Sequence, residues 1–208
     1  MKRPHALVFD LGNVLLPIDL EKTYEAFSLL SSKYSATEIK YMTQEEELWS
    51  AYESGLQTDQ EFEAFLVDRL QLVCTSEQFH KAFNALLLQF DSSVCQYISS
   101  LNNSFPIYLL SNTSSLHSRI FLDCAYPNYN LFDSFTSIHL SFEMGMVKPN
   151  VAIYEQLVAH NHLQDYQIVF FDDNVRNIES ARQFGWDAVL INPHTSLHQI
   201  QDHIKNLC

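Results

Sequence analysis

Four short runs of consecutive apolar residues are spaced along the chain. They are Ala6–Phe9, Ile107–Leu110, Ile168–Phe171 and Ala188–Ile191. A strand buried on both faces reads as a continuous apolar run, whereas a strand with one wet face alternates apolar and polar positions. The runs therefore predict strands of a parallel sheet that is covered on both sides.

The segments between these runs have helical spacing. After Phe171, one helical face is formed by Val175, Ile178, Ala181, Arg182 and Phe184. Gly185 then predicts the end of this helix, because glycine accepts the left-handed conformation that often closes one. Strand and helix in alternation predict an α/β fold with a doubly wound parallel sheet.

The stretch after the first strand breaks this alternation, because it shows repeated helix starts and no convincing strand. Thr43 and Glu46 have the spacing of a capping box, and so do Thr58 and Glu61. Gly55 between them predicts a break between two helices. These signals predict a small α-helical cap inserted after the first strand.

The expected domain organisation follows from that insertion. Residues 1–15 and 91–208 would form the α/β core, and residues 16–90 the α-helical cap. No internal repeat or proline-rich linker separates the two parts, so we expect the cap to pack directly on the core.

The charge balance excludes some classes of partner. There are 12 Lys and Arg against 25 Asp and Glu, a formal net charge of −13. Such an acidic chain repels nucleic-acid backbones and anionic membranes, so neither is expected as the main partner. A small anionic ligand remains compatible, because a bound metal ion reverses the field locally.

Other features favour a cytoplasmic globular protein. Apolar residues make up 47% and charged residues 18% of the chain, which excludes disorder. No apolar stretch reaches the roughly 20 residues of a membrane span, and the run that ends at Phe9 is too short for a signal peptide. The four cysteines form no C-x-x-C pair and are interpreted as reduced thiols; they are Cys74, Cys95, Cys124 and Cys208.

Polar side chains follow three of the predicted strands. Asp10 follows the first, Ser111 and Asn112 the second, and Asp172 and Asp173 the third. Ligands of open α/β sheets bind beyond the carboxyl ends of the strands, so these groups are expected to face one crevice. Clustered carboxylates repel one another unless protons or a cation offset their charge, and Mg²⁺ suits such a set.

Lys148 supplies a cation to the same crevice. Gly145 permits a tight turn before it, and Pro149 suits the first turn of a helix after it. Taken singly, Asp10 and Ser111 would be interpreted as helix caps and Lys148 as a surface residue. Their joint pattern favours a site in which Lys148 pairs with Asp10 and with a phosphate oxygen.

These residues resemble the motifs of the haloacid dehalogenase (HAD) superfamily of hydrolases. The four motifs, in order, are Phe9-Asp10-Leu-Gly-Asn-Val14, Leu110-Ser111-Asn112, Lys148-Pro149 and Phe170-Phe-Asp-Asp173. The resemblance covers essentially the whole chain and is nearest to a bacterial branch of the alpha-glucose-1-phosphate phosphatase type. It implies a Rossmann-like core and a helical cap after the first motif.

The resemblance also implies a nucleophile and a metal site. Asp10 would attack phosphorus and form an aspartyl-phosphate, which divides a difficult displacement into two easier steps. Mg²⁺ would be held by Asp10, the main-chain carbonyl of Gly12 and Asp173, with Asp172 as a further ligand, direct or through water.

The resemblance implies a phosphate site beside the metal. Ser111 and the main chain of Asn112 would bind phosphate oxygens. Lys148 would stabilise the charge and orient Asp10, and with the metal it would neutralise an approaching dianion.

Gly12 departs from the superfamily's pattern, since its phosphatases usually have an Asp there that protonates the leaving alkoxide. A water, the substrate or a cap residue is left to deliver the proton, and each cap candidate also suits an ordinary solvated helix position. The candidates are Glu46, Glu47, Tyr52 and Glu53. His117 likewise suits either a helix face or the mouth of the site.

The function favoured by these observations is Mg²⁺-dependent hydrolysis of a small phosphorylated metabolite, with a sugar phosphate as the expected class. Two alternatives stay open. One is a carbon–halogen hydrolase that uses Asp10, against which the Asp172–Asp173 pair argues, because that reaction needs no metal. The other is a phosphate-binding regulatory protein with weak or no catalysis, which Gly12 favours.

Overall fold

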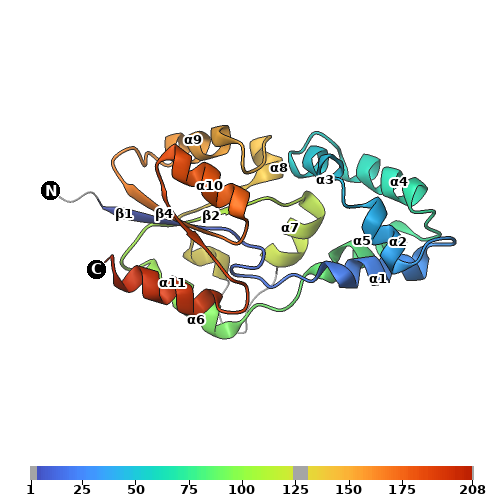
Figure 1. Cartoon of the computed structure of the whole chain (residues 1–208), viewed down its shortest axis with the longest axis horizontal. Helices are drawn as coiled ribbons and strands as arrows, with labels where there is room; N and C mark the ends of the chain where they lie inside the picture. Colours follow the sequence, from blue (N-terminus) through green and yellow to red (C-terminus); the bar gives the residue numbers. More distant parts are fainter. Residues whose placement is uncertain (1–3, 124–130, 208) are drawn as a thin grey trace.

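The computed structural model of the chain describes residues 4–123 and 131–207 (Figure 1). Its described strands form one parallel sheet in the order β3-β2-β1-β4-β5. The strands are β1 His5–Phe9, β2 Ile107–Ser111, β3 Ser137–Leu140, β4 Gln167–Asp172 and β5 Asp187–Leu190. Three of them contain a predicted apolar run and β5 overlaps the fourth run, so the expected α/β class with a parallel sheet is confirmed.

The sequence pattern missed strand β3. It lies at an edge of the sheet and pairs only with β2. Its residues Ser137 and Ile138 are half-buried, and only the last two are buried. Because an edge strand of four residues with polar positions gives no continuous apolar run, the criterion that found the buried strands fails here.

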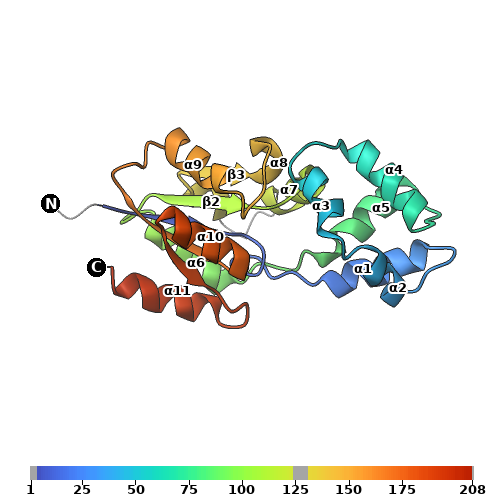
Figure 2. The same ribbon diagram turned by 45° about the horizontal axis from the view of Figure 1, so that its top comes forward.

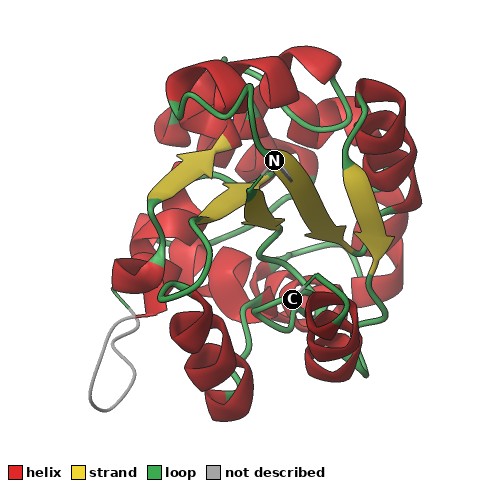
Figure 3. Cartoon of the chain, turned by 90° about the vertical axis from the view of Figure 1, so that its left-hand side faces the viewer, coloured by secondary structure: helices red, strands yellow, loops and turns green. Residues whose placement is uncertain are grey.

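Helices cover both faces of the sheet (Figure 3). Along β1, Ala6 and Val8 pack with α9 and α10, while Leu7 and Phe9 pack with α6 and α11 on the opposite face. These helices are α6 Ser92–Leu101, α9 Val151–His160, α10 Val175–Phe184 and α11 Ser196–Lys205. Because successive strand residues point to opposite faces and both faces are covered by helices, the residues on both faces must be apolar. This explains the continuous apolar runs.

Helix α10 confirms the predicted stop but not the whole predicted face. Gly185, with φ of +101°, closes the helix after Phe184. Ile178 and Ala181 are buried as expected, whereas Val175 is 52% exposed. Val175 is the first residue of the helix.

The part of the sequence between β1 and α6 forms a group of helices that lies beside the sheet (Figure 2). They are α1 Leu20–Leu30, α2 Ala36–Met42, α3 Glu46–Glu53, α4 Asp59–Arg69 and α5 Ser76–Phe83. They enclose an apolar core of their own, with Phe27, Phe62 and Phe79 almost fully buried. The expected helical insertion is therefore present. The domain boundaries at residues 15/16 and 90/91 stay a prediction.

Shorter elements complete the described chain. They are α7 Ser115–Leu122, α8 Ser141–Met144 and the 3₁₀ turns η1 Asn84–Leu86 and η2 Leu131–Ser134. Of the cysteines expected to be thiols, Cys74 and Cys95 are unpaired, and Cys124 and Cys208 lie outside the described residues. None of the helices described has both the length and the apolar character that crossing a membrane requires.

One of the two predicted capping boxes is confirmed. The Thr58 side chain accepts a bond from the Glu61 N–H, and the Glu61 carboxylate accepts one from the Thr58 N–H. The prediction at Thr43 is wrong, because this residue ends α2, and its hydroxyl donates to the Ile39 carbonyl at 2.8 Å. A threonine serves either end of a helix, so spacing alone does not decide which.

Gly55 brings the loop after α3 against the core. Its φ is +70°, and a Cβ added there would lie 2.2 Å from the Phe142 carbonyl oxygen of α8. Asp59, at the start of α4, adds a polar link to the core, since it accepts a bond from Arg119 of α7 at 2.6 Å. The cap is thereby held against the carboxyl end of the sheet.

Gly55→Ala is expected to destabilise the protein more than Gly145→Ala. Both glycines have positive φ, which costs a residue with a Cβ about 1–2 kcal/mol, but only at Gly55 would the methyl group meet backbone. The overlap should add about 1–3 kcal/mol to the loss of unfolding free energy. Urea unfolding of both variants measures the difference, and equal losses would contradict the close approach.

Candidate active site

Three neighbouring strands deliver the predicted polar side chains to one edge of the sheet. Asp10 directly follows β1, Ser111 ends β2 and Asp172 ends β4. The Asp10 N–H donates to the Phe171 carbonyl at 2.9 Å, which extends the pairing of β1 and β4 to Asp10. Because β1 lies between the other two strands, their carboxyl ends meet, as expected.

The Lys148 ammonium is the centre of this edge. It donates to Asp10 Oδ1 at 2.6 Å, to Asp172 Oδ2 at 2.7 Å and to the Leu110 carbonyl oxygen at 2.8 Å. Lys148 is 3% exposed and Asp172 is fully buried. All three ammonium protons therefore have acceptors, which is the condition for keeping this charge inside a protein.

Electrostatics hold Lys148 in its charged form. Burial alone would lower the pKa of this ammonium, but the carboxylates of Asp10 and Asp172 outweigh burial and raise the pKa above its ordinary value. Lys148 is consequently a permanent cation at neutral pH.

The Asn112 side chain positions the Lys148 backbone. Its Nδ2 donates to the Lys148 carbonyl at 2.9 Å, and its Oδ1 accepts from the Lys148 N–H at 2.8 Å. The amide thus bonds both polar groups of one peptide residue. The family resemblance implies only a role for the Asn112 main chain.

The two carboxylates after β4 have different surroundings. Asp172 accepts bonds on both oxygens, from Lys148, the Asn174 N–H and the Asn177 side chain. Asp173 is half-buried and accepts from Asn13 Nδ2 at 3.0 Å. The acceptor capacity of Asp172 is therefore largely used by the protein, whereas Asp173 retains capacity for a ligand.

The site carries more negative than positive charge. One carboxylate oxygen each from Asp10, Asp172 and Asp173 lies within 4.8 Å of the others, against the single ammonium of Lys148. Burial raises the pKa of Asp10 to about 7, because Lys148 only partly offsets it, and burial also raises the pKa of Asp173. An all-oxygen cluster with excess negative charge suits a hard divalent cation.

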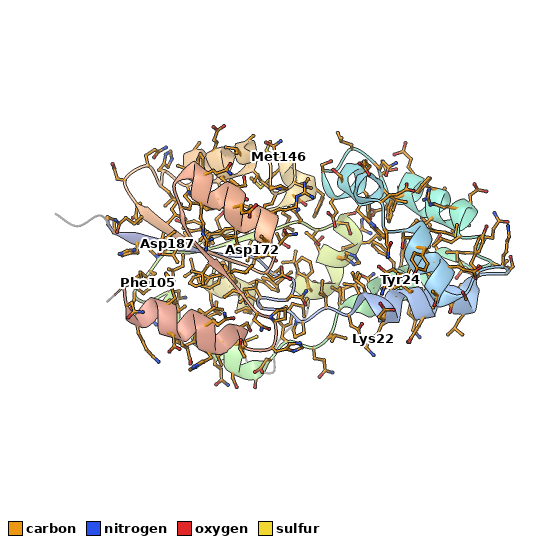
Figure 4. The ribbon with its side chains drawn as sticks, viewed as in Figure 1. Lys22, Tyr24, Phe105, Met146, Asp172 and Asp187 are labelled. Atoms are coloured by element: carbon orange, nitrogen blue, oxygen red, sulfur yellow. The ribbon has the colours of Figure 1, made fainter. Side chains whose placement is uncertain are left out.

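A cavity of about 520 Å³ opens over this cluster, between the core and the cap. Its polar floor comes from the core and includes Asp10, Ser111, Asn112, Lys148 and Asp173. Its opposite wall comes largely from the cap and includes Tyr24, Trp49, Glu53 and Phe83. The labels of Figure 4 include Asp172, at the end of β4 in the core, and Tyr24, on α1 of the cap. The cavity therefore joins a charged floor to a largely apolar wall.

Only one of the cap residues considered as proton donors is shown to reach the cavity. Glu53 lines it. Tyr52 is buried in the cap and donates to Asp59 at 2.9 Å, and Glu47 is exposed elsewhere on α3. The side chain of Glu46 lies outside the described part of the structure.

His117 lines the cavity as an uncharged group. Its ring stacks on Phe83 with centroids 4.2 Å apart, and its Nδ1 lies 2.9 Å from Asn84 Oδ1. Burial lowers the pKa of His117 to about 3. The open interpretation of this residue is thus resolved in favour of the mouth of the site, without a positive charge at neutral pH.

Sequence reasoning missed two asparagines. Asn13, with φ of +58°, bonds Asp173 across the turn after β1. Asn177, one turn into α10, bonds both oxygens of Asp172. Asn177 lies five residues after Asp172, in the first turn of α10, where side chains point back toward the start of the helix. This position is the signal that could have identified it.

Lys148→Met is expected to lower the free energy of unfolding by about 3–5 kcal/mol at pH 7 in EDTA, because Asp10 and Asp172 would stay buried without a cation. The loss should shrink as the pH falls from 7 to 5, since protonation of the Asp10 carboxylate removes part of the buried negative charge. Chemical denaturation at both pH values measures it.

Lys40→Met is the matched control. Lys40 pairs with Glu21 on the surface, where both side chains are exposed. Removal of such a pair costs less than about 1 kcal/mol. Similar losses for the two lysines would contradict the central place of Lys148.

Comparison with known proteins identifies several that are similar to this chain in sequence or in structure. A D-ribitol-5-phosphate phosphatase of Bacteroides thetaiotaomicron is 27% identical over 188 residues, which cover 88% of this chain and 89% of that protein. The crystal structure of a HAD family enzyme from the same organism, in complex with magnesium and inorganic phosphate, has a TM-score of 0.82 at 24% identity, covering 92% of this chain and 95% of that one. An L-2-haloacid dehalogenase of Xanthobacter autotrophicus has a TM-score of 0.60 at 18% identity, covering 89% and 76%.

A family model for haloacid dehalogenase-like hydrolases matches residues 4–185, which include both strand-end carboxylate motifs, the Lys148 loop and the helical insertion. The chain belongs to the haloacid dehalogenase-like hydrolase family.

Proposed function

We propose that the protein hydrolyses a small phosphomonoester, with Asp10 as nucleophile and Mg²⁺ as cofactor. The observation that carries the proposal is the pairing of Asp10 with Lys148 at the floor of a cavity that also contains Ser111 and Asp173. A buried lysine that holds a carboxylate in place beside further oxygen ligands suits phosphoryl transfer.

The proposed nucleophile is oriented before substrate binds. Lys148 holds Oδ1 of Asp10 at 2.6 Å, and the extended pairing of β1 with β4 fixes the Asp10 backbone. Attack on phosphorus would form an aspartyl-phosphate, which water then hydrolyses. Lys148 stays charged throughout, because its pKa is raised, and it offsets negative charge on the phosphoryl oxygens.

The proposed metal ligands are Asp10, the Gly12 carbonyl and Asp173. Bound Mg²⁺ would neutralise phosphate charge and polarise its oxygens. Asp172 is proposed to act through water or through Lys148, because its oxygens already accept bonds from Lys148, Asn174 and Asn177.

The phosphate oxygens are proposed to bind Ser111 and Asn112. Among the described residues, the Ser111 hydroxyl makes only a 3.5 Å contact with the Asn112 carbonyl, so it has donor capacity for a ligand. The Asn112 side chain is committed to Lys148, which leaves its main-chain N–H for phosphate.

The substrate class is proposed to be a sugar or polyol phosphate. A cavity of about 520 Å³ accommodates a small metabolite. The relative that acts on D-ribitol 5-phosphate supports this class. The carboxylate cluster argues against the carbon–halogen alternative, in which three acidic side chains and no metal would meet an anionic substrate.

A phosphate-binding protein of weak activity is the second candidate, and Gly12 is the observation that favours it. Phosphate release from sugar phosphates, polyol phosphates and acyl phosphates, with Mg²⁺ and with EDTA, separates the two. We expect release that requires Mg²⁺. A folded, Mg²⁺-loaded sample that releases no phosphate from any of them would contradict the enzyme.

Asp10→Asn is expected to lower kcat at least about 10³-fold, because the amide is a poor nucleophile and loses the charge that Lys148 holds. Asp68→Asn, an exposed position on α4, is the control and should retain full activity. Activity of the Asp10 variant near that of the control would overturn the assignment of the nucleophile.

Asp173→Asn is expected to raise the Mg²⁺ concentration that gives half-maximal activity by about tenfold or more, because one charged oxygen ligand is lost while Asn13 still has a partner. Titration of activity with Mg²⁺ measures this shift. An unchanged Mg²⁺ requirement would show that Asp173 is not a ligand.

A further inference from the structure

The proposed reaction needs a proton that the core does not supply. The departing alkoxide of a sugar or polyol phosphate is a strong base, and its departure is slow unless an acid protonates it. Position 12, two residues after the proposed nucleophile, is a glycine and offers no acidic side chain. The inference below rests on the proposed function and concerns the origin of this proton.

Most titratable groups in the cavity are unsuited to the task. The Lys148 ammonium is held by two carboxylates, and His117 is uncharged at neutral pH. Asp10 and Asp173 are the proposed nucleophile and metal ligand. Burial raises the pKa of Tyr24 above its ordinary value, so its phenol is too weak an acid.

Glu53 enters the same cavity from the opposite side. It is the last residue of α3, and Gly55, two residues later, is pressed against the Phe142 carbonyl of α8. This contact fixes the end of α3 over the core. Glu53 is half-buried, lines the cavity that contains Asp10, and feels the charge of Lys148.

The Glu53 carboxyl group is uncommitted within the described structure. Among the described residues no hydrogen bond or ion pair engages it, in contrast to Asp59 and Asp172, which accept several bonds each. A half-buried carboxyl group without a protein partner is available to a ligand that enters the cavity.

We propose that Glu53 is the catalytic acid of this enzyme and replaces the side chain missing at Gly12. As an Asp10 oxygen bonds to phosphorus, the bond from phosphorus to the ester oxygen breaks, and its electron pair stays on that oxygen. The oxygen takes the proton of the Glu53 carboxyl group, so the alcohol leaves neutral and Glu53 becomes a carboxylate.

The second step restores both side chains. A water oxygen bonds to phosphorus, the bond from phosphorus to the Asp10 oxygen breaks, and the electron pair returns to the Asp10 carboxylate. Glu53 accepts one proton of the water, and the other proton leaves on hydrogen phosphate. The cycle therefore returns Asp10 and Glu53 to their starting states.

The surroundings of Glu53 agree with this role. Burial raises the pKa of Glu53 to about 7, and Lys148 only partly offsets the effect. The group thus retains a proton near neutral pH and can also accept one. Other charged groups that line the cavity are Asp10, Asp173 and Arg176, and the last of these has a partner of its own.

Glu53→Gln separates an acid from a residue that only binds substrate. The first turnover is compared for a sugar phosphate, whose alkoxide needs a proton, and for nitrophenyl phosphate, whose phenolate leaves without one. We expect a loss of about 10²–10⁴-fold for the sugar phosphate and of less than about tenfold for nitrophenyl phosphate. The first-turnover rate of the wild type on the sugar phosphate should fall above about pH 7, as Glu53 loses its proton, and the variant should lack this fall.

Glu47→Gln is the matched control, because Glu47 is an exposed residue of the same helix and should change neither rate. Equal losses of the Glu53 variant on both substrates, or a higher KM with an unchanged first-turnover rate, would overturn the proposal in favour of a binding role. Wild-type-like turnover of the sugar phosphate would overturn it outright. A wild type without Mg²⁺-dependent phosphate release would refute the proposed function instead.

Discussion

The buried Lys148 ammonium is the constraint on which the site depends. A lysine enclosed to this degree is stable only when each of its protons has an acceptor, and here the acceptors come from the ends of three different strands. Asp10, Leu110 and Asp172 must therefore lie within a few ångströms of one another. The parallel order of β2, β1 and β4 achieves this, because it brings three carboxyl ends to one edge.

Three asparagine side chains hold the charged groups of this cluster in one arrangement. Asn112 binds the backbone of Lys148, Asn177 binds Asp172, and Asn13 binds Asp173. Neutral amides supply hydrogen bonds without adding charge, so they orient the carboxylates and leave the excess negative charge for a cation. As a consequence, the oxygens of Asp172 are occupied by donors from the protein, whereas Asp173 can still bind a ligand.

The cap completes the site from a separate part of the chain. Gly55 and Asp59 hold its helices against the core, and the wall that these helices present to the cavity is largely apolar and includes the carboxyl group of Glu53. An apolar wall excludes water from the floor of the cavity, and exclusion of water strengthens the electrostatic interactions there. The core thus contributes the charged groups of the site, and the cap contributes the wall that encloses them.

The strand-end site follows from the sequence, since apolar runs identify buried strands and the rules of parallel sheets bring their ends together. Asp10 and Lys148 were predictable in this way, from short segments whose meaning does not depend on distant contacts. The folded chain was needed to show that Thr43 ends a helix, that β3 forms an edge strand, and that Glu53 rather than Glu47 faces the cavity. The reason is that helix patterns determine which residues share a face, but the direction of that face is determined by packing between segments far apart in the chain.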